Sequence, residues 1–472
     1  MTQNAAKDDA KTHDGFRNSV SIVSTEGKRN WIYPRKPEGT FYRLRTYFSG
    51  AILIVLFGTP FLKVNGHPFM LFNVIDRKFI LLGMGFGPHD FYLLGLAAIT
   101  VIVFIILFTV VFGRLFCGWI CPQTVFMEMV FRKIDYWIEG DHREQRRLNE
   151  SAWNARKFFT KSAKYCIYFA VSFLIANAFL SYVIGLDGLI RIVTDPPARH
   201  LAGLTAILVF SGIFYWVFAW FREQACILVC PYGRLQGVLL DRNSIVIAYD
   251  YLRGEPRGKL RRGEKREAGD CIDCNQCVEV CPTGIDIRNG TQLECVNCTA
   301  CIDACDTVMV KVEKPKGLIR YDSANSIANK TGFLWTPRII GYSVVLLVLL
   351  SLLTAFLVRR SDVDVTVLRT PGMFYQEQPG DRVSNVYDIK VLNKTFEEVP
   401  VALKLENEQG EIQLIGEPLS AVPQGIVESK LLVVLSRDRV KAMSTPITIG
   451  IYSGNRRITT VATSFLGPVT KR

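Results

Sequence analysis

The chain contains five long stretches in which apolar residues follow one another without a charged residue. A helix needs about 20 such residues to cross the roughly 30 Å hydrocarbon core of a bilayer. Helices buried in a soluble protein would show a polar face at helical spacing, and the second stretch, FYLLGLAAITVIVFIILFTVVF, has none. The pattern therefore predicts five membrane-spanning helices, at residues 46–62, 91–112, 165–186, 201–221 and 339–358.

A different pattern begins after Arg360. Short runs rich in β-branched residues, separated by turn residues at intervals near ten, indicate β-strands: VDVTVL, NVYDIKVL, VPVALKL, LLVVL, TPITIGIY and RRITTVATSF. About 110 residues with this rhythm favour an all-β immunoglobulin-like sandwich. The stretch contains no cysteine, so the disulfide of antibody domains is missing.

The basic residues predict how the spans are oriented. Segments 1–45, 113–164 and 222–338 contain 36 Lys and Arg residues, whereas segments 63–90 and 187–200 contain five. Because cytoplasmic loops are enriched in Lys and Arg, the N-terminus and both long loops are expected in the cytoplasm and the β-rich tail in the periplasm. The first 40 residues lack an apolar signal-peptide core, so we expect the first span to act as an uncleaved signal.

Composition fits a membrane protein with several domains. The 472 residues (53.3 kDa) are 49% hydrophobic with a mean hydropathy of +0.20, and yet the formal net charge is +13. Intrinsic disorder, collagen and a small secreted fold are excluded, and a single soluble globule is disfavoured. We predict a polar cytoplasmic segment (1–40), a transmembrane domain with four spans (41–250), a cytoplasmic ferredoxin domain with a basic linker (251–337), a fifth span (338–360) and a periplasmic immunoglobulin-like domain (361–472).

Eight of the thirteen cysteines form two runs with the spacing C-x2-C-x2-C-x3-C. In bacterial-type two-cluster ferredoxins the first three cysteines of a run bind one [4Fe-4S] cluster and the fourth binds the other. We therefore assign Cys271, Cys274, Cys277 and Cys305 to one cluster, and Cys281, Cys295, Cys298 and Cys301 to the second. Zinc is the alternative, but zinc ribbons use two separated pairs of cysteines. The fold expected for this insert is α+β, and the second run ends in Cys305-Asp306 rather than Cys-Pro.

A second cysteine pattern, C-x3-C-P, occurs twice, each time after a span and an arginine. The first copy follows Arg114 and the second follows Arg222. If the helix continues, cysteines four residues apart lie on one face and present two sulfurs to one atom. Thiolates suit Cu(I), zinc or iron–sulfur iron, so copper, a third cluster or a dithiol–disulfide pair are all open, as are ordinary buried cysteines. The cysteines concerned are Cys117, Cys121, Cys226 and Cys230, while the isolated Cys166 is expected to be structural.

The remaining features are less specific. The stretch from Arg253 to Arg266, RGEPRGKLRRGEKR, is interpreted as a solvated linker, with docking of an acidic electron donor or of anionic lipid headgroups as alternatives. No Rossmann fingerprint, P-loop or Ser-His-Asp arrangement is visible, and no nucleic acid partner is expected. Electrons must therefore come from a separate donor protein.

Together these features resemble the CcoG/FixG/RdxA family of accessory proteins of cbb3-type cytochrome c oxidase. The resemblance lies in five spans, two C-x3-C-P motifs, the insert CPTGIDIRNGTQLEC, a second run ending in DACD and a β-rich tail, and it covers the chain from about Trp31. It implies a multi-pass protein of the bacterial inner membrane that reduces Cu(II) to Cu(I) during oxidase assembly. The C-x3-C-P cysteines would be the copper-reducing site, an unidentified cytoplasmic donor would supply electrons, and the periplasmic domain would dock the oxidase or a copper chaperone.

Two other functions fit the same motifs. An electron-transfer subunit would pass electrons to a partner membrane enzyme and would not touch copper. A membrane redox sensor or assembly scaffold would use the clusters to report oxidation state, and it would not reduce Cu(II) continuously. An oxidoreductase of the cupric reductase type is the function that the resemblance favours.

Overall fold

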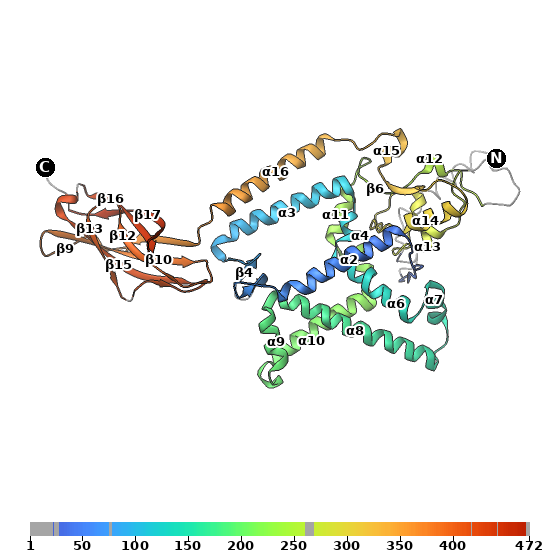
Figure 1. Cartoon of the computed structure of the whole chain (residues 1–472), viewed down its shortest axis with the longest axis horizontal. Coiled ribbons are helices and arrows are strands. Elements are labelled where there is room, and N and C mark those ends of the chain that lie inside the picture. Colours follow the sequence, from blue (N-terminus) through green and yellow to red (C-terminus); the bar gives the residue numbers. More distant parts are fainter. Residues whose placement is uncertain are drawn as a thin grey trace. The chain divides into compact units, whose positions relative to one another are not determined.

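The computed structural model describes residue 22 and residues 28–74, 78–259, 269–416, 418–440 and 442–468. The chain forms two compact units (Figure 1). The first contains the residues up to Phe61 together with Leu96–Ser351, and the second contains Leu62–Gly95 together with Leu352–Arg472. The second unit thus combines the β-rich tail with residues 62–95, which the sequence placed among the spans.

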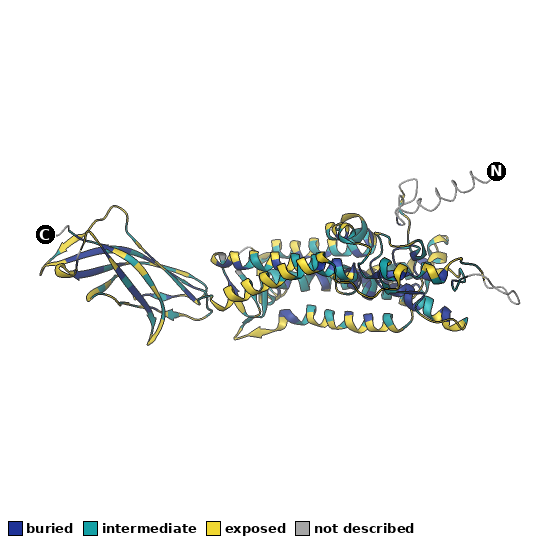
Figure 2. Cartoon of the chain, turned by 90° about the horizontal axis from the view of Figure 1, so that it is seen from above, coloured by how far each residue is buried: buried dark blue, intermediate teal, exposed yellow. Residues whose placement is uncertain are grey.

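Within the described part of the chain, five helices are long and apolar enough to cross a membrane, as predicted. Few of their residues are buried, so most of the apolar surface of these helices is exposed, as Figure 2 shows along the helices of the first unit. Their bounds are α2 Thr40–Gly58 continued by η2 Thr59–Phe61, α3 Phe91–Phe112, α8 Ala155–Ile184, α10 Leu201–Trp216 continued by the π-helix η6 Val217–Phe221, and α16 Pro337–Val358.

Helix α8 begins ten residues before the predicted span. Its N-cap is Asn154, whose side chain accepts a hydrogen bond from the backbone N–H of Lys157 at 2.8 Å. Hydropathy alone could not place this start, because the first turns contain lysines that an apolar window excludes. Two of them, Lys161 and Lys164, pair with Glu139.

The chain after α3 and the chain after α10 fold in a similar way. After α3 come α4 Leu115–Trp119, α5 Pro122–Thr124, the π-helix η4 Val125–Phe131, α6 Arg132–Ile138 and α7 His142–Glu150. After α10 come the π-helix η7 Ala225–Val229 and α11 Pro231–Leu239, and the chain then enters the ferredoxin region. Helix α9, Leu186–Thr194, lies between α8 and α10 in the sequence. In both repeats a short helix starts at the proline of C-x3-C-P.

The ferredoxin region contains short helices between two paired strands. Strands β6 Val246–Tyr249 and β7 Ile319–Asp322 are antiparallel, and between them lie α12 Tyr251–Gly254, α13 Gln276–Glu279, η8 Ile287–Asn289 and α14 Ala300–Lys311, with α15 Ala324–Asn329 after β7. The two cysteine runs share one backbone feature. In each run the residues on either side of the second cysteine have left-handed φ angles, between 51° and 67°. They are Asp273 and Asn275 in the first run and Asn297 and Thr299 in the second.

The second unit is a β-sandwich, as predicted (Figure 1). One sheet has the order β13-β15-β10-β8 with β9 paired to β10, the other has the order β12-β16-β17, and both contribute to one core that includes Val433 and Ile449. All six predicted runs lie in strands, apart from Val401 in the run VPVALKL. The bounds are β8 Val363–Arg369, β9 Gln376–Gln378, β10 Arg382–Asn393, β11 Val399–Pro400, β12 Ala402–Leu405, β13 Gly410–Ile415, β14 Ser420–Ala421, β15 Ile426–Ser436, β16 Ser444–Ser453 and β17 Arg456–Leu466.

Residues 62–95 add two small sheets to this unit, which the sequence analysis missed because the strands are only two to four residues long. They are formed by β1 Lys63–Val64 with β2 His67–Pro68, and by β3 Met70–Asn73, β4 Lys78–Leu81 and β5 Met84–Phe86. The fully buried Asp90 joins this segment to the tail through Arg360 and Lys394, each at 2.9 Å. Burial alone would raise the pKa of Asp90, but hydrogen bonds from the two cations outweigh it and hold the pKa below its usual value.

We predict that Asp90→Asn loosens this part of the unit, because it leaves two largely buried cations without their shared carboxylate. Removing one partner of a buried ion pair costs about 3 kcal/mol or more, which corresponds to roughly 100-fold faster amide exchange where opening is local. Hydrogen–deuterium exchange of the full chain in detergent should show this in peptides around Asp90 and Lys394. Asp388→Asn, which removes a half-exposed carboxylate 3.7 Å from Lys430, is the control and should change little. Equal exchange in both variants would contradict the prediction.

Candidate redox site

The cysteines of the ferredoxin region form two groups that each draw on both runs. Cys271, Cys274, Cys277 and Cys305, the distal cysteines, line one small internal cavity. Burial, followed by the charges of the other three distal cysteines and Asp306, raises the pKa of Cys305 to about 12. The fourth cysteine of the second run therefore lies with the first three of the first run, as in the crossed ligand assignment.

The second group, the proximal cysteines, consists of Cys281, Cys295, Cys298 and Cys301. Burial raises the pKa of Cys301 well above its usual value, and the charges of Cys298, Cys295 and Cys281 act on it in the same direction. Two buried donors beside this group, the Asn297 side-chain amide and one nitrogen of Arg45, have no hydrogen-bond partner. Buried donors are rarely left unpaired, so they fit a site whose acceptors are cluster sulfurs.

The spacing of the sulfurs distinguishes a cluster from a single ion. Zinc bound tetrahedrally at about 2.3 Å brings its four sulfurs to within about 4 Å of one another. Among the described residues, which include every cysteine, no three His, Cys, Asp or Glu side chains are arranged to hold one metal ion. The crossed grouping of the two runs is instead the arrangement expected of a ferredoxin that holds two [4Fe-4S] clusters.

The C-x3-C-P cysteines, Cys117, Cys121, Cys226 and Cys230, come together from the two repeats. Burial raises the pKa of Cys226 to about 12, and the charges of Cys121, Cys117 and Cys230 act on it in the same direction. Cys117 is buried, with its pKa raised to about 11 by burial, and its Sγ donates to Gln236 Oε1 at 2.9 Å. The two motifs thus lie close enough for their thiols to interact electrostatically.

The helix does not continue through either motif. The two cysteines of a motif therefore do not lie on one helical face, which was the condition for presenting two sulfurs to one atom. Cys121 and Cys230 are extended N-cap residues, with ψ of 121° and 109°. The cause is the following proline, which disfavours helical geometry in the residue before it. Both cysteines donate their backbone N–H to a carbonyl five residues earlier, of Phe116 and Ala225, each at 2.9 Å. Such π-type turns are frequent at functional sites.

The C-x3-C-P site lies directly against the proximal cysteines. Cys117 and Cys298 belong to the same buried cluster, together with Val280, Val296 and Ala300. At Gly118 a Cβ would stand 2.7 Å from the carbonyl oxygen of Asn297 and closer still to that of Val296, so only glycine fits.

Two arginines hold this contact together. Arg45 in α2 donates to the carbonyl oxygen of Gly118 at 2.7 Å. Arg114 donates to Gln236 at 3.3 Å and to the carbonyl oxygen of Leu293, and its charge acts on both Cys117 and Cys295. Arg114 therefore lies between the two sulfur sites and stabilises negative charge on either one.

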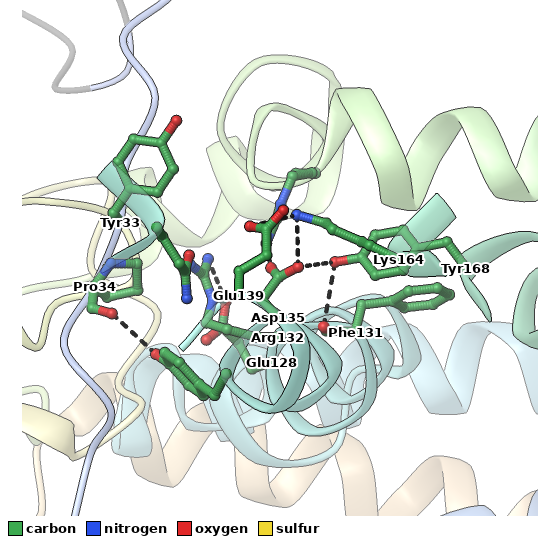
Figure 3. Close-up of polar contacts among 12 residues, drawn as sticks. Tyr33, Pro34, Glu128, Phe131, Arg132, Asp135, Glu139, Lys164 and Tyr168 are labelled. Carbon is green, nitrogen blue, oxygen red and sulfur yellow. Dashed lines mark hydrogen bonds and ion pairs between the residues drawn. The ribbon is translucent and has the colours of Figure 1, made fainter. Parts of the chain in front are cut away.

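The other repeated arginine, Arg222, anchors a buried ionic network. Its guanidinium lies 2.9 Å from Asp135, which also accepts from Lys164 at 2.8 Å and from the Tyr168 hydroxyl at 2.6 Å (Figure 3). Burial would raise the pKa of Asp135, but Arg222 and Lys164 outweigh it and hold the pKa far below its usual value. Each arginine thus contacts the helix that follows the other repeat's motif, α11 for Arg114 and α6 for Arg222, which ties the two motifs together.

The carboxylate of Asp303 connects the ferredoxin region to the first span. It accepts hydrogen bonds from the backbone N–H groups of Phe41, at 3.2 Å, and Tyr42, at 2.8 Å, at the start of α2. A carboxylate is favoured there because the first N–H groups of a helix have no partner within it. The DACD ending of the second run thus includes a helix-capping residue, a role that its sequence does not reveal.

The remaining predicted features have simpler positions. Cys166 is exposed on α8, and its structural role stays a prediction. In the basic stretch, Arg253 pairs with Asp270 at 2.6 Å and Arg257 lies 3.4 Å from Glu255. Residues 260–268, which contain half of the predicted basic linker, and residues 1–21 and 23–27 of the polar N-terminal segment lie outside the described residues.

The fold and the cysteine groups define a class, that of membrane-bound iron–sulfur redox proteins with an immunoglobulin-like C-terminal domain. Family models match residues 94–140 (a 4Fe-4S binding domain), 221–324 (a 4Fe-4S dicluster domain) and 353–468 (the Ig-like fold at the C-terminal of FixG).

Relatives extend the match to most of the chain. Protein RdxB of Cereibacter sphaeroides is 33% identical over 84% of this chain and 87% of its own length, and RdxA of the same organism is 35% identical over 81% and 83%. The nitrogen fixation protein FixG of Rhizobium meliloti is 32% identical over 64% of this chain and 59% of its own length. The chain belongs to the FixG/RdxA family.

We predict that double cysteine variants will distinguish crossed from sequential ligation. If ligation is crossed, Cys271→Ala/Cys305→Ala removes two ligands of one cluster and about four irons per chain, whereas Cys301→Ala/Cys305→Ala disables both clusters and removes about eight. Sequential ligation, with each run binding its own cluster, predicts the reverse order. Iron and acid-labile sulfide, measured per chain after anaerobic purification, give the answer, and Cys166→Ala is the control that should lose none.

Proposed function

We propose that this protein is a membrane-bound oxidoreductase that reduces Cu(II) to Cu(I) for the assembly of a cbb3-type cytochrome c oxidase. The distal and proximal cysteines hold two [4Fe-4S] clusters, which supply one-electron chemistry when bound. The C-x3-C-P cysteines form the site from which the electron leaves for copper. Each Cu(II) ion takes up one electron and becomes Cu(I).

The observation that supports this proposal best is that Cys117 and Cys298 belong to one buried cluster. It joins the C-x3-C-P site to the proximal cysteines through buried side chains, with Arg114 between the two sets of sulfurs. On the other side, the distal group includes the exposed Cys274. The order of the groups therefore favours entry of electrons near Cys274 and exit near Cys117.

Orientation and electron supply follow from the sequence. The excess of basic residues in the segments that contain the cysteines favours a cytoplasmic position for them in the bacterial inner membrane, where thiols stay reduced. A separate cytoplasmic donor would reduce the distal side. The sandwich would then be periplasmic, and because residues 361–472 contain neither cysteine nor histidine, we assign it to docking the oxidase or a copper chaperone rather than to binding copper.

Copper is the substrate whose chemistry suits this site. Cu(II) oxidises free thiols, whereas Cu(I) is a soft ion that binds thiolates stably. An exit site with sulfur ligands and an internal supply of electrons can reduce Cu(II) without consuming its own thiols.

We expect copper reduction to depend on the C-x3-C-P cysteines. The full chain is reduced anaerobically, freed of reductant by gel filtration and mixed with Cu(II) and a Cu(I)-specific chelator. Wild type should form about one Cu(I) per stored electron, and Cys117→Ala/Cys121→Ala should form little while keeping the iron of the distal and proximal sites. Cys166→Ala should behave like wild type. Reduction by the double variant at the wild-type rate would refute the assignment.

Gly118→Ala tests the contact itself. The new Cβ would collide with backbone oxygens that cannot move independently, so the motif must shift away from Cys298. Because misplacement by about 1 Å can cost about 100-fold in rate, we expect Cu(I) formation to slow by about tenfold or more with iron content unchanged. The control is Gly212→Ala in α10, where a Cβ meets nothing within 4 Å. An unchanged rate in Gly118→Ala would show that the close approach is not needed.

An electron relay is the second candidate. The buried cluster that joins Cys298 to Cys117 would carry electrons to a partner membrane enzyme as well as to copper. The variant Cys117→Ala/Cys121→Ala separates the two functions. A cupric reductase loses Cu(II) reduction in this variant, whereas a relay, whose clusters reduce copper only incidentally, keeps it.

A further inference from the structure

The distal and proximal sites differ in how the arginines beside them are paired. At the distal site, Arg288 lines the same cavity as the distal cysteines. Its guanidinium pairs with Asp273 at 2.6 Å and with Asp286 at 2.7 Å. A further carboxylate, that of Asp306, acts on Cys305. At the distal site the positive charge of the arginine is therefore offset by carboxylates.

The proximal cysteines adjoin two buried arginines with a different set of partners. Arg45 is 3% exposed and its charge acts on Cys298, and Arg114 is 4% exposed and its charge acts on Cys295. Within the described residues, the hydrogen bonds of both guanidinium groups go to uncharged acceptors rather than to carboxylates. A buried charge that no opposite charge offsets is costly, so both arginines favour negative charge on the proximal side.

Arg45 has a donor to spare beside the proximal cysteines. Arg45 and Cys298 line the same small internal cavity, and Nη2 of Arg45 is buried without a hydrogen-bond partner. Glu128 lines this cavity too, but its carboxylate pairs with Arg132 at 3.0 Å. Burial raises the pKa of Cys298 to about 11, and the charge of Arg45 is the strongest influence that lowers it. Arg45 is thus placed to stabilise a thiolate and any further negative charge on this side.

We propose that Arg45 raises the reduction potential of the proximal cluster above that of the distal cluster, with its Nη2 donating to a sulfur on the proximal side. One electron adds one negative charge to a cluster, and an adjacent cation and hydrogen bonds to sulfur stabilise that charge. Transfer of one electron from the distal side, which is oxidised, to the proximal side, which is reduced, is then downhill. This inference rests on the two clusters of the proposed function and gives the direction of electron flow between them, but it does not depend on copper.

The first test is a redox titration of the full chain in detergent, without copper, followed by electron paramagnetic resonance. The proximal centre is the one whose signal Cys298→Ala removes, and in wild type its midpoint should lie above that of the distal centre. Arg45→Met removes the charge and should lower the proximal midpoint by about 59 mV or more, which is a tenfold change in the one-electron equilibrium. Arg43→Met, which removes an exposed arginine from the same helix, is the control and should change neither midpoint.

Arg45→Lys separates the charge from the hydrogen bonds. Lysine keeps the charge but lacks the planar fork of donors, so the proximal midpoint should lie between those of wild type and Arg45→Met. A proximal midpoint below the distal one in wild type would overturn the proposal. So would an unchanged proximal midpoint in Arg45→Met protein that retains its iron.

Asp273→Asn tests the distal side without touching Arg45. Asparagine keeps an acceptor for Arg288 and tolerates the left-handed φ of 51° at this position, so the main loss is one negative charge. The distal midpoint should rise and the proximal midpoint should stay the same. An unchanged distal midpoint would contradict the account even if Arg45→Met failed to bind iron.

This inference and the proposed function fail separately. Midpoints in the predicted order, in a protein that does not reduce Cu(II), would keep the role of Arg45 and refute the cupric reductase. Cu(II) reduction by a protein whose midpoints have the opposite order would do the reverse.

Discussion

The backbone of Gly118 packs against the carbonyl groups of Val296 and Asn297 more closely than any side chain would allow. This contact joins the first C-x3-C-P motif to the loop between Cys295 and Cys298. The other links serve the same junction: Arg45 holds the Gly118 carbonyl, Arg114 reaches Leu293, and Asp303 caps α2. Two regions that could have been separate domains are thereby fixed in one unit, with their sulfur sites side by side.

The two repeats explain why this junction can contain a third set of sulfurs. Neither motif has four ligands, and a proline in each one ends the helix so that the second cysteine takes an extended conformation. The exchanged contacts, Arg114 with Gln236 and Arg222 with Asp135, hold the halves together. Buried ionic groups of this kind are costly unless fully paired, so they serve better to fix geometry than to add stability.

Much of the architecture could be predicted from the sequence because its signals are local. Apolar windows located the spans, β-branched runs located the strands of the sandwich, and cysteine spacing indicated two clusters. The close contacts could not be predicted, since Gly118, Gln236 and Asp303 matter only through residues about 73 to 262 positions away. The start of α8 was missed for a related reason, because its lysines are paired with carboxylates from another helix.

The central claim is that electrons reach the C-x3-C-P site through the proximal cysteines. The most direct measurement uses Cys298→Ala, with loss of the proximal cluster and retention of the distal one verified by iron content and spectra. The protein is reduced, freed of reductant and mixed with Cu(II) in a stopped-flow instrument, and the visible absorbance of the distal cluster is followed. The account predicts that the distal cluster stays reduced while wild type reoxidises rapidly. Reoxidation of the variant at the wild-type rate would contradict it.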